Sequence, residues 1–247
     1  MRAYPTETLE DPSAPSQPEL PDGVVEELAA AVGRAAAREV AVKLARAAEA
    51  YGRDRYADSL RMARQVRRLA PGAVAPRELC GLACYRLGRW KDAIRYLEPL
   101  WRESGNVDQV PVLMDCHRAL RERLGVELLW AELVKASPPA DVLVEGRLVY
   151  AAFLADEGRL GEAISLLSRA GAARRLQHPA ERHLRQWYVL ADLYDRAGDT
   201  TRAREVFGWL ASDAPDMADV RDRLADLGAR GRRARHGRRG RPAGEQR

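Results

Sequence analysis

The sequence predicts an all-α protein built from repeated helical hairpins, and three observations lead to this fold class. Alanine, the strongest helix former, is abundant, while only two Phe occur among 247 residues, so aliphatic and alanine packing is expected. No segment shows the alternation of β-branched and polar residues that is typical of a strand. One pattern also recurs along the chain, in the segments RYADSLRMA (55–63), RWKDAIRYL (89–97), RLGEAISLL (159–167) and DTTRAREVF (199–207).

The N-terminal part divides into two segments of different composition. Residues 1–22 contain five prolines among Ser, Thr and acidic residues, and one arginine against five acidic side chains gives a net charge of −4. Such a segment buries too little apolar surface to become ordered, so a disordered acidic leader is expected. From Gly23 the chain turns rich in Ala, Val, Leu and Glu, which predicts a helical addition over 23–39; one long helix or two, broken near Gly33, fit the pattern.

Each recurring segment opens the second helix of a hairpin after a short turn. One shared position is a turn residue, and a second carries a small side chain that lets two helices approach closely. An apolar residue follows four places later. The turn residues are Asp54, Gly88, Gly158 and Gly198, and the small residues are Ser59, Ala93, Ala163 and Ala203.

These positions resemble the 34-residue motif of the tetratricopeptide repeat (TPR) family. The last repeat carries the resemblance almost completely, through Trp187, Leu190, Ala191, Tyr194, Gly198, Ala203, Phe207 and Pro215. Repeats then begin near residues 40, 74, 108, 144 and 184, and together span residues 40–216. The third repeat is degenerate, because Glu122 stands at the expected turn position and Glu127 at the small-residue position.

The resemblance implies a right-handed α-solenoid of about five tetratricopeptide-like hairpins, in which each hairpin buries its apolar face on its neighbours. A terminal repeat needs a polar cap. Residues 217–229 predict such a cap helix, with Val220, Leu224 and Leu227 facing inward and Gly228 ending the helix.

In this family the first helices of successive repeats line a concave groove that takes up segments of other proteins. The resemblance places these groove candidates here: Leu44, Tyr51, Glu78, Leu82, Tyr85, Val112, Cys116, Leu148, Ala152, Tyr188 and Asp192. One branch of the family grips a C-terminal carboxylate with Lys and Asn, but Leu44 and Ala48 stand at those places. The expected partner is therefore a protein with an apolar peptide or helix. The alternative is that several candidates pack in the core or against the 23–39 helix.

The C-terminal segment, residues 230–247, carries eight arginines against one glutamate, a net charge of +7. A disordered tail is expected, with anion-binding candidates Arg230, Arg232, Arg233, Arg235, Arg238, Arg239 and Arg241. A nucleic-acid-associated protein, RNA above all, is the alternative function. Because the tail has no aromatic residue to stack on a base, its contact with nucleic acid would be weak and sensitive to salt.

Signals of catalysis, metals or cofactors are weak. A zinc site can be written from Cys80, Cys84, Cys116 and His117, but free cysteines at these family positions are better explained as small core residues. His178 and His183 have no partner at catalytic spacing, and no nucleotide-binding or hydrolase motif occurs. We expect no enzyme activity, no metal and no cofactor. An odd number of cysteines and the lack of a long apolar stretch predict a cytoplasmic protein without membrane contact.

Overall fold

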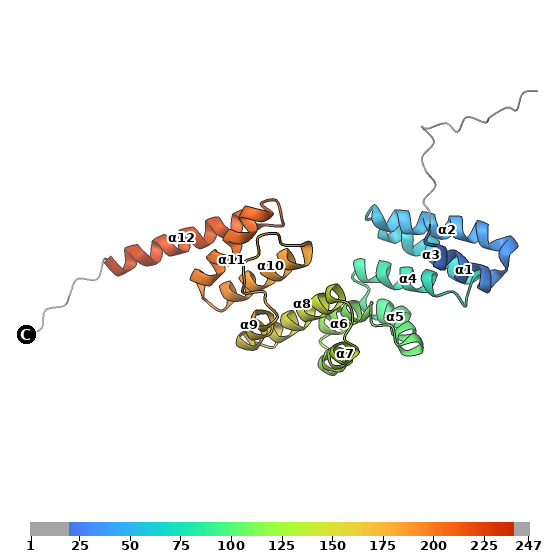
Figure 1. Cartoon of the computed structure of the whole chain (residues 1–247), viewed down its shortest axis with the longest axis horizontal. Helices are drawn as coiled ribbons and strands as arrows, with labels where there is room; N and C mark the ends of the chain where they lie inside the picture. Colours follow the sequence, from blue (N-terminus) through green and yellow to red (C-terminus); the bar gives the residue numbers. More distant parts are fainter. Residues whose placement is uncertain (1–19, 240–247) are drawn as a thin grey trace, which may run out of the picture. The chain divides into compact units, whose positions relative to one another are not determined.

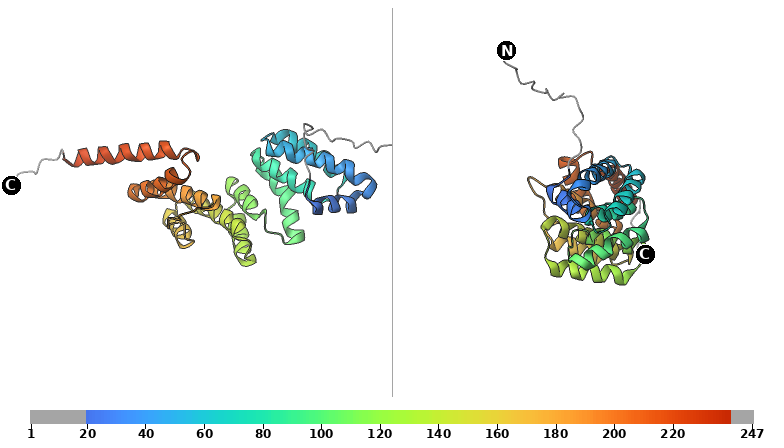
Figure 2. Two further views of the ribbon diagram at one scale, coloured as in Figure 1. Left: turned by 45° about the horizontal axis from the view of Figure 1, so that its top comes forward. Right: turned by 90° about the vertical axis from the view of Figure 1, so that its right-hand side faces the viewer.

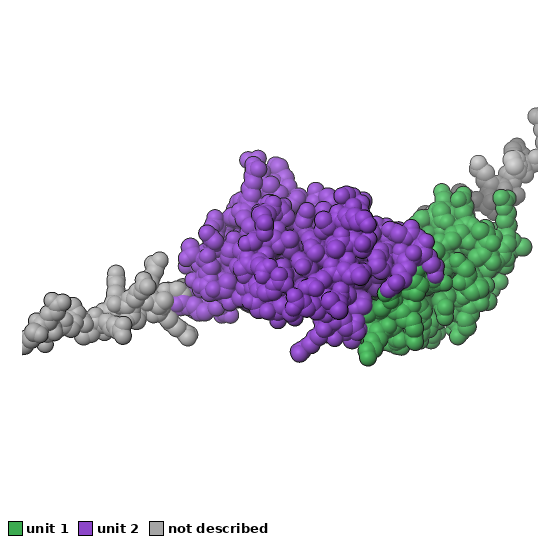
Figure 3. Space-filling view, turned by 90° about the horizontal axis from the view of Figure 1, so that it is seen from below, with its two compact units in different colours: residues 1–100 green, residues 101–247 purple. Residues whose placement is uncertain are grey.

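The structure is a computed structural model that describes residues 20–239, with side chains over 20–230. Within this range the chain forms twelve α-helices and no strand, which confirms the all-α prediction. It divides into two compact units, Met1–Leu100 and Trp101–Arg247, shown in two colours in Figure 3. The boundary falls within α5 (Trp90–Ser104), and each unit is described by itself.

The first unit contains α1 (Asp22–Val32), α2 (Arg34–Gly52), α3 (Tyr56–Leu69), α4 (Val74–Arg86) and most of α5 (Figure 1). Helix α1 packs on α2, α2 on α3, and α3 on α4. The chain passes from α1 to α2 through Gly33 at φ 80°, a conformation that glycine adopts without steric cost. A break at this glycine, one of the two arrangements that the sequence allowed, is therefore what the structure shows.

A single apolar cluster holds α1 against the first hairpin. Leu28 of α1 is fully buried together with Leu44 of α2 and Val66 of α3. A carboxylate strengthens this contact, because Glu27 Oε1 accepts hydrogen bonds from the backbone N–H groups of Val74, at 2.6 Å, and Ala75, at 3.1 Å. These N–H groups have no acceptor within their own helix, so Glu27 caps the first turn of α4.

The second unit contains α6 (Val110–Ala119), α7 (Arg123–Ala136), α8 (Ala140–Asp156), α9 (Leu160–Arg169), α10 (Glu181–Arg196), α11 (Thr200–Asp213) and α12 (Val220–Arg239). Pairs α6–α7, α8–α9 and α10–α11 are antiparallel hairpins in contact along the chain, as Figure 2 shows. The first helices also contact one another, α6 with α8 and α8 with α10. Stacking of hairpins through their first helices is the arrangement of an α-solenoid.

One turn is repeated at five places and joins the two helices of each hairpin. The residue at its centre has a positive φ, from 57° to 80°, and its N–H bonds to the carbonyl three residues earlier, while the next N–H bonds five residues back. This pair of bonds is the Schellman motif, which ends a helix and reverses the chain. The central residues are Asp54, Gly88, Arg121, Gly158 and Gly198.

The turns correct the sequence alignment of the third repeat by one residue. Arg121, with φ 59°, occupies the position that the sequence assigned to Glu122. Five residues later Val126 is fully buried, as are Ser59, Ala93, Ala163 and Ala203 at the same distance from their turns, whereas Glu127 is partly exposed. The sequence pattern missed this because neither a glycine nor a small residue marks the two positions.

Close packing within a hairpin is clearest between α4 and α5. A Cβ added at Gly81 would lie 2.5 Å from the Leu97 side chain, which is itself buried. A side chain at this crossing would force the buried Leu97 to shift. None of the helices in the described part of the chain has the length and apolarity needed to cross a membrane.

The cap helix and the ends of the chain differ in part from the prediction. Val220 and Leu227 of α12 are fully buried, and Leu224 is partly buried. The helix does not end at Gly228 but continues to Arg239, into the segment predicted to be a disordered tail. Helix α1 begins at Asp22. The rest of the predicted leader and tail, residues 1–19 and 240–247, lie outside the described residues.

Candidate partner-binding site

Three predicted groove residues are core residues and cannot contact a partner. Leu44, Cys116 and Leu148 are 2%, 0% and 7% exposed. Leu44 is covered because α1 packs on α2 and places Leu28 in the same cluster. Cys116 on α6 and Leu148 on α8 lie on two helices that pack against each other. The alternative that some candidates belong to the core or face the N-terminal helix is correct for these three.

In the first unit the remaining candidates form a half-exposed surface on two neighbouring first helices. Tyr51 lies near the end of α2, and Glu78, Leu82 and Tyr85 follow one another on α4. Helices α2 and α4 are in contact, and all four side chains are partly exposed. Leu82 and the two tyrosines supply the apolar area of this surface, and we call Tyr51, Leu82 and Tyr85 the tyrosine face.

Aromatic contacts hold both tyrosines of this face in place. Tyr51 packs edge-on against Tyr56, with ring centroids 5.2 Å apart, and Tyr85 packs in the same way against Trp90 at 5.5 Å. The Arg86 guanidinium lies over the Tyr56 ring, 4.3 Å from its centroid. Such contacts restrict the rings before any partner binds, which lowers the entropy lost on binding.

In the second unit Val112 and Ala152 remain partly exposed, on α6 and α8. These helices are in contact, so the two residues belong to one stack of first helices. Both side chains are small and apolar. Unlike Tyr51 and Tyr85 of the first unit, neither of these two candidates is aromatic.

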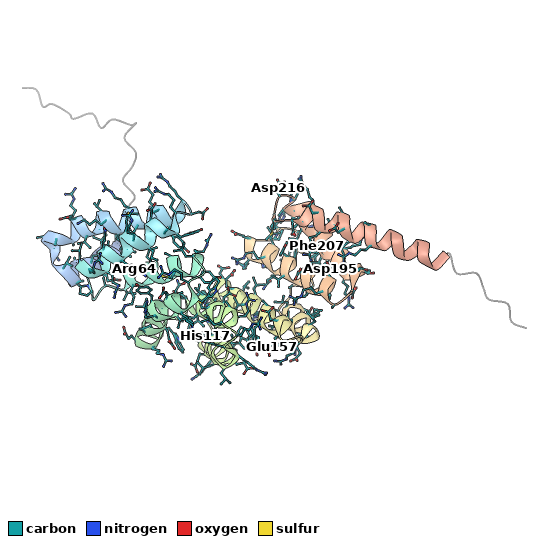
Figure 4. All side chains as sticks on the ribbon, turned by 180° about the vertical axis from the view of Figure 1, so that it is seen from behind. Arg64, His117, Glu157, Asp195, Phe207 and Asp216 are labelled. Atoms are coloured by element: carbon teal, nitrogen blue, oxygen red, sulfur yellow. The ribbon has the colours of Figure 1, made fainter. Side chains whose placement is uncertain are left out.

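The last two candidates, Tyr188 and Asp192 on α10, are already bound by the chain itself. The Tyr188 hydroxyl donates a hydrogen bond to Asp219 at 2.6 Å. Asp192 accepts one from Arg223 of α12 at 2.7 Å, and Asp195 accepts one from the same guanidinium at 3.2 Å. The cap helix thus occupies the side of α10 that the sequence assigned to a partner. The labelled Asp195 and Phe207 in Figure 4 mark this region.

Aromatic packing and charge reinforce the contact between α10 and α12. Arg223 lies over the Phe207 ring at 5.2 Å, and Tyr188 packs edge-on against the same ring at 5.9 Å. Burial raises the pKa of Tyr188, and the hydrogen bond to Asp219 raises it further, to about 12. Burial alone lowers the pKa of Arg223, but the hydrogen bond to Asp192 and the surrounding carboxylates raise it overall.

Only the first of the predicted anion-binding arginines has a described side chain, and it already has a partner. Arg230 lies 2.8 Å from Asp195, so it belongs to the contact between α12 and α10 and is not a free anion ligand. Five further candidates belong to α12, where only their backbone is described, at positions 232, 233, 235, 238 and 239. Arg241 lies outside the described residues.

The cysteines are buried in the core, and His183 bonds to the backbone. Cys80, Cys84 and Cys116 are free and buried, and burial raises the pKa of Cys80 to about 11. Among the described residues no three His, Cys, Asp or Glu side chains are grouped so that they could hold a metal ion. The Nδ1 of His183 accepts a hydrogen bond from the Ala180 N–H at 3.0 Å, which ties the start of α10.

One cleft in the first unit was missed by the sequence analysis. It measures about 270 Å³ and lies beside α3; we call it the arginine cleft, lined by Ala57, Leu60, Arg61, Arg64, Gln65, Arg68, Leu87 and Arg89. The signal was present in the sequence as three arginines on α3 at spacings of three and four, which place them on one helix face. This spacing does not stand out in the sequence, because arginine is frequent throughout the chain.

Comparisons with known proteins support the fold. No protein-family model matches the sequence, and no curated protein is detectably similar to it. The structure is similar to the crystal structure of a thermophilic TPR protein in Thermus thermophilus, with a TM-score of 0.60 and 20% identity, over 75% of this chain and 96% of that one. The protein therefore has the fold of a TPR-like α-solenoid, as the sequence predicted.

Proposed function

We propose that the protein is a non-catalytic scaffold or adaptor of the cytoplasm that binds another protein through the exposed sides of its first helices. The observation that carries this proposal is the stacking of first helices, α2 with α4 and α6 with α8, each pair leaving apolar side chains half exposed. Solenoids offer such extended surfaces for partner segments, and the fold of the Thermus protein is of this kind. Three free, buried thiols favour a reducing compartment.

The tyrosine face of the first unit is the proposed binding surface for an apolar peptide or helix. It combines one leucine with two tyrosines whose rings are fixed by neighbouring aromatic side chains. Tyrosine is enriched at protein interfaces because it supplies a large contact area with one polar end. Leu44 and Leu148 are not part of this proposal, since the fold buries both.

Affinity capture from a native lysate tests the proposal, with Leu82→Ser compared against Leu124→Ser in the full-length chain. Leu124 on α7 is 80% exposed and lies away from the first helices, so it controls for the loss of any surface leucine. We expect Leu82→Ser to lose a protein that the wild type and Leu124→Ser both recover. Equal recovery by all three forms would remove the tyrosine face from consideration.

A nuclease treatment and a chain that ends at Ala229 separate this function from nucleic-acid association. Capture that survives both treatments supports the protein scaffold. Capture that is lost after nuclease treatment and also lost in the truncated chain, and that falls steeply with added salt, would instead assign the function to the Arg-rich C-terminal segment.

A further inference from the structure

We propose that the arginine cleft is a second binding site, which receives the carboxylate side chains of an acidic, leucine-containing segment of a partner protein. It goes beyond the proposed function, because the cleft is formed by α3 and the turn before α5, whereas the tyrosine face lies on α2 and α4. The labelled Arg64 in Figure 4 marks its place.

The lining of the cleft carries charge of one sign, and the carboxylates beside it, Asp58 and Asp92, are paired with Arg61 and Arg89. Four of the eight lining residues are arginines, and none is acidic. The guanidinium group carries five N–H donors in a planar fork that matches a carboxylate. A hollow lined by several such groups concentrates positive potential on the surface.

Helix geometry and a repeated turn bring the four arginines together. Arg61, Arg64 and Arg68 follow at spacings of three and four along α3, so they project from one face. Arg89 arrives from the next hairpin, directly after Gly88 at φ 69°. The Schellman turn fixes this residue, because the Arg89 N–H bonds to the Cys84 carbonyl at 2.9 Å.

Three of the guanidinium groups are held in place by bonds that leave other donors unused. Arg64 Nε donates to the Tyr96 hydroxyl at 3.2 Å, and Arg89 donates to Asp92 through Nε, at 2.8 Å, and through one terminal nitrogen. One terminal nitrogen of Arg61 donates to Asp58 at 2.9 Å. These side chains are therefore ordered before a ligand binds.

Arg68 differs from the other three. Within the described part of the chain it has no hydrogen bond or ion pair, and it is exposed at the edge of the cleft. Its charge is thus available to a ligand without the loss of an internal contact. This makes Arg68 the most informative position for a substitution.

The other lining residues favour a protein segment over a nucleic acid. Ala57 and Leu87 add exposed apolar surface, and Leu87 is 38% exposed, whereas Leu60 lies beneath them in the core. A glutamate beside a leucine can place its carboxylate among the arginines and its aliphatic neighbour on this surface. Sites for single-stranded nucleic acid commonly add aromatic rings on which the bases stack, and the lining contains none.

The test uses the full chain and a fluorescein-labelled peptide, Glu-Leu-Glu-Glu-Leu-Glu, followed by fluorescence anisotropy. The glutamine analogue of the peptide and a labelled oligothymidylate serve as comparison probes. Arg68→Glu is the principal variant, and Arg61→Glu is the second. Arg46→Glu is the matched control, because Arg46 is exposed on α2, outside the cleft, and has no described ion pair.

We expect the acidic peptide to bind the wild type and Arg46→Glu alike, and to bind Arg68→Glu and Arg61→Glu about tenfold more weakly or worse. Binding should weaken as salt is added, and the glutamine peptide should not bind. Unchanged thermal unfolding of Arg68→Glu shows that the fold is retained. The proposal is overturned if the peptide does not bind, if Arg46→Glu loses binding equally, or if the oligothymidylate binds more tightly through the same arginines.

Discussion

Arg223 of α12 and Asp192 of α10 are joined by a hydrogen-bonded ion pair of 2.7 Å, and this pair fixes the cap helix on the last hairpin. Both side chains are less than one third exposed, so solvent screens their attraction less than that of a surface pair. The same guanidinium reaches Asp195 and covers the Phe207 ring. The last repeat is therefore closed by the protein's own helix.

A double-mutant cycle on Arg223→Ala and Asp192→Ala should show a coupling free energy of about 1 kcal/mol in urea unfolding. The exposed pair of Lys43 and Glu39, one turn apart on α2, provides the control, and its coupling should be clearly smaller because solvent screens it. Coupling of the first pair no larger than that of the control would show that the ion pair does not hold α12.

Stability at alkaline pH should depend on Tyr188. Its pKa is about 12 in the folded protein and about 10 in an unfolded chain. Between these values the unfolded chain has lost the proton that the folded chain keeps, so the free energy of unfolding falls as pH rises from 10 to 12. Below pH 10 the protonated Tyr188 hydroxyl makes its full contribution to the free energy of unfolding. Tyr188→Phe removes the titrating group, so its stability should fall less steeply over this range in urea titrations at fixed pH.

The five equivalent turns allow two substitutions that should change the free energy of unfolding in opposite directions. Arg121 holds a left-handed conformation that costs a residue with a side chain about 1 kcal/mol relative to glycine. Arg121→Gly should therefore stabilise the protein by about 0.5–1 kcal/mol. Gly158→Ala should destabilise it by about 1 kcal/mol, because its φ is 77° although no atom lies within 4 Å of the added Cβ. Denaturant midpoints measure both, and shifts of the same sign would contradict the turn assignment.

The small-residue position of the last repeat should not accept a large side chain. Ala203 is fully buried on α11, so Ala203→Arg overfills the contact and buries an unpaired charge, at a cost of several kcal/mol. Thr201→Arg, at an exposed position of the same helix, is the control. We expect a large fall in the melting temperature for the first and little change for the second. Equal melting temperatures would mean that the two helices do not meet at Ala203.

The fold was predictable because its signals are local and repeated. Gly88, Gly158 and Gly198 mark turns that need a positive φ, and small residues five places later mark where helices cross. The third repeat lacks both signals, with Arg121 and Val126 at these positions, and it was there that the alignment slipped by one residue. The same physical rules hold in that repeat, but residues other than the preferred ones satisfy them.

The binding surface was predicted less well, because exposure is a property of the packed molecule. The family resemblance placed Leu44, Leu82 and Leu148 on the groove side of first helices, yet only Leu82 stays partly exposed. Likewise, nothing local distinguishes Arg68 from the other arginines of the chain. Its interest comes from Arg89, which lines the same cleft from another hairpin.

By itself the sequence determined the helical class, the TPR-like hairpins and their turns, since backbone preference and apolar spacing act within a few tens of residues. The tertiary structure decided which sides of the hairpins remain accessible. Helix α1 buries Leu44, and α12 takes Tyr188 and Asp192 through Asp219 and Arg223. The Tyr188–Asp219 and Asp192–Arg223 contacts each join residues 31 positions apart in the sequence. The energy of such contacts depends on shape and charge that only the folded chain brings together.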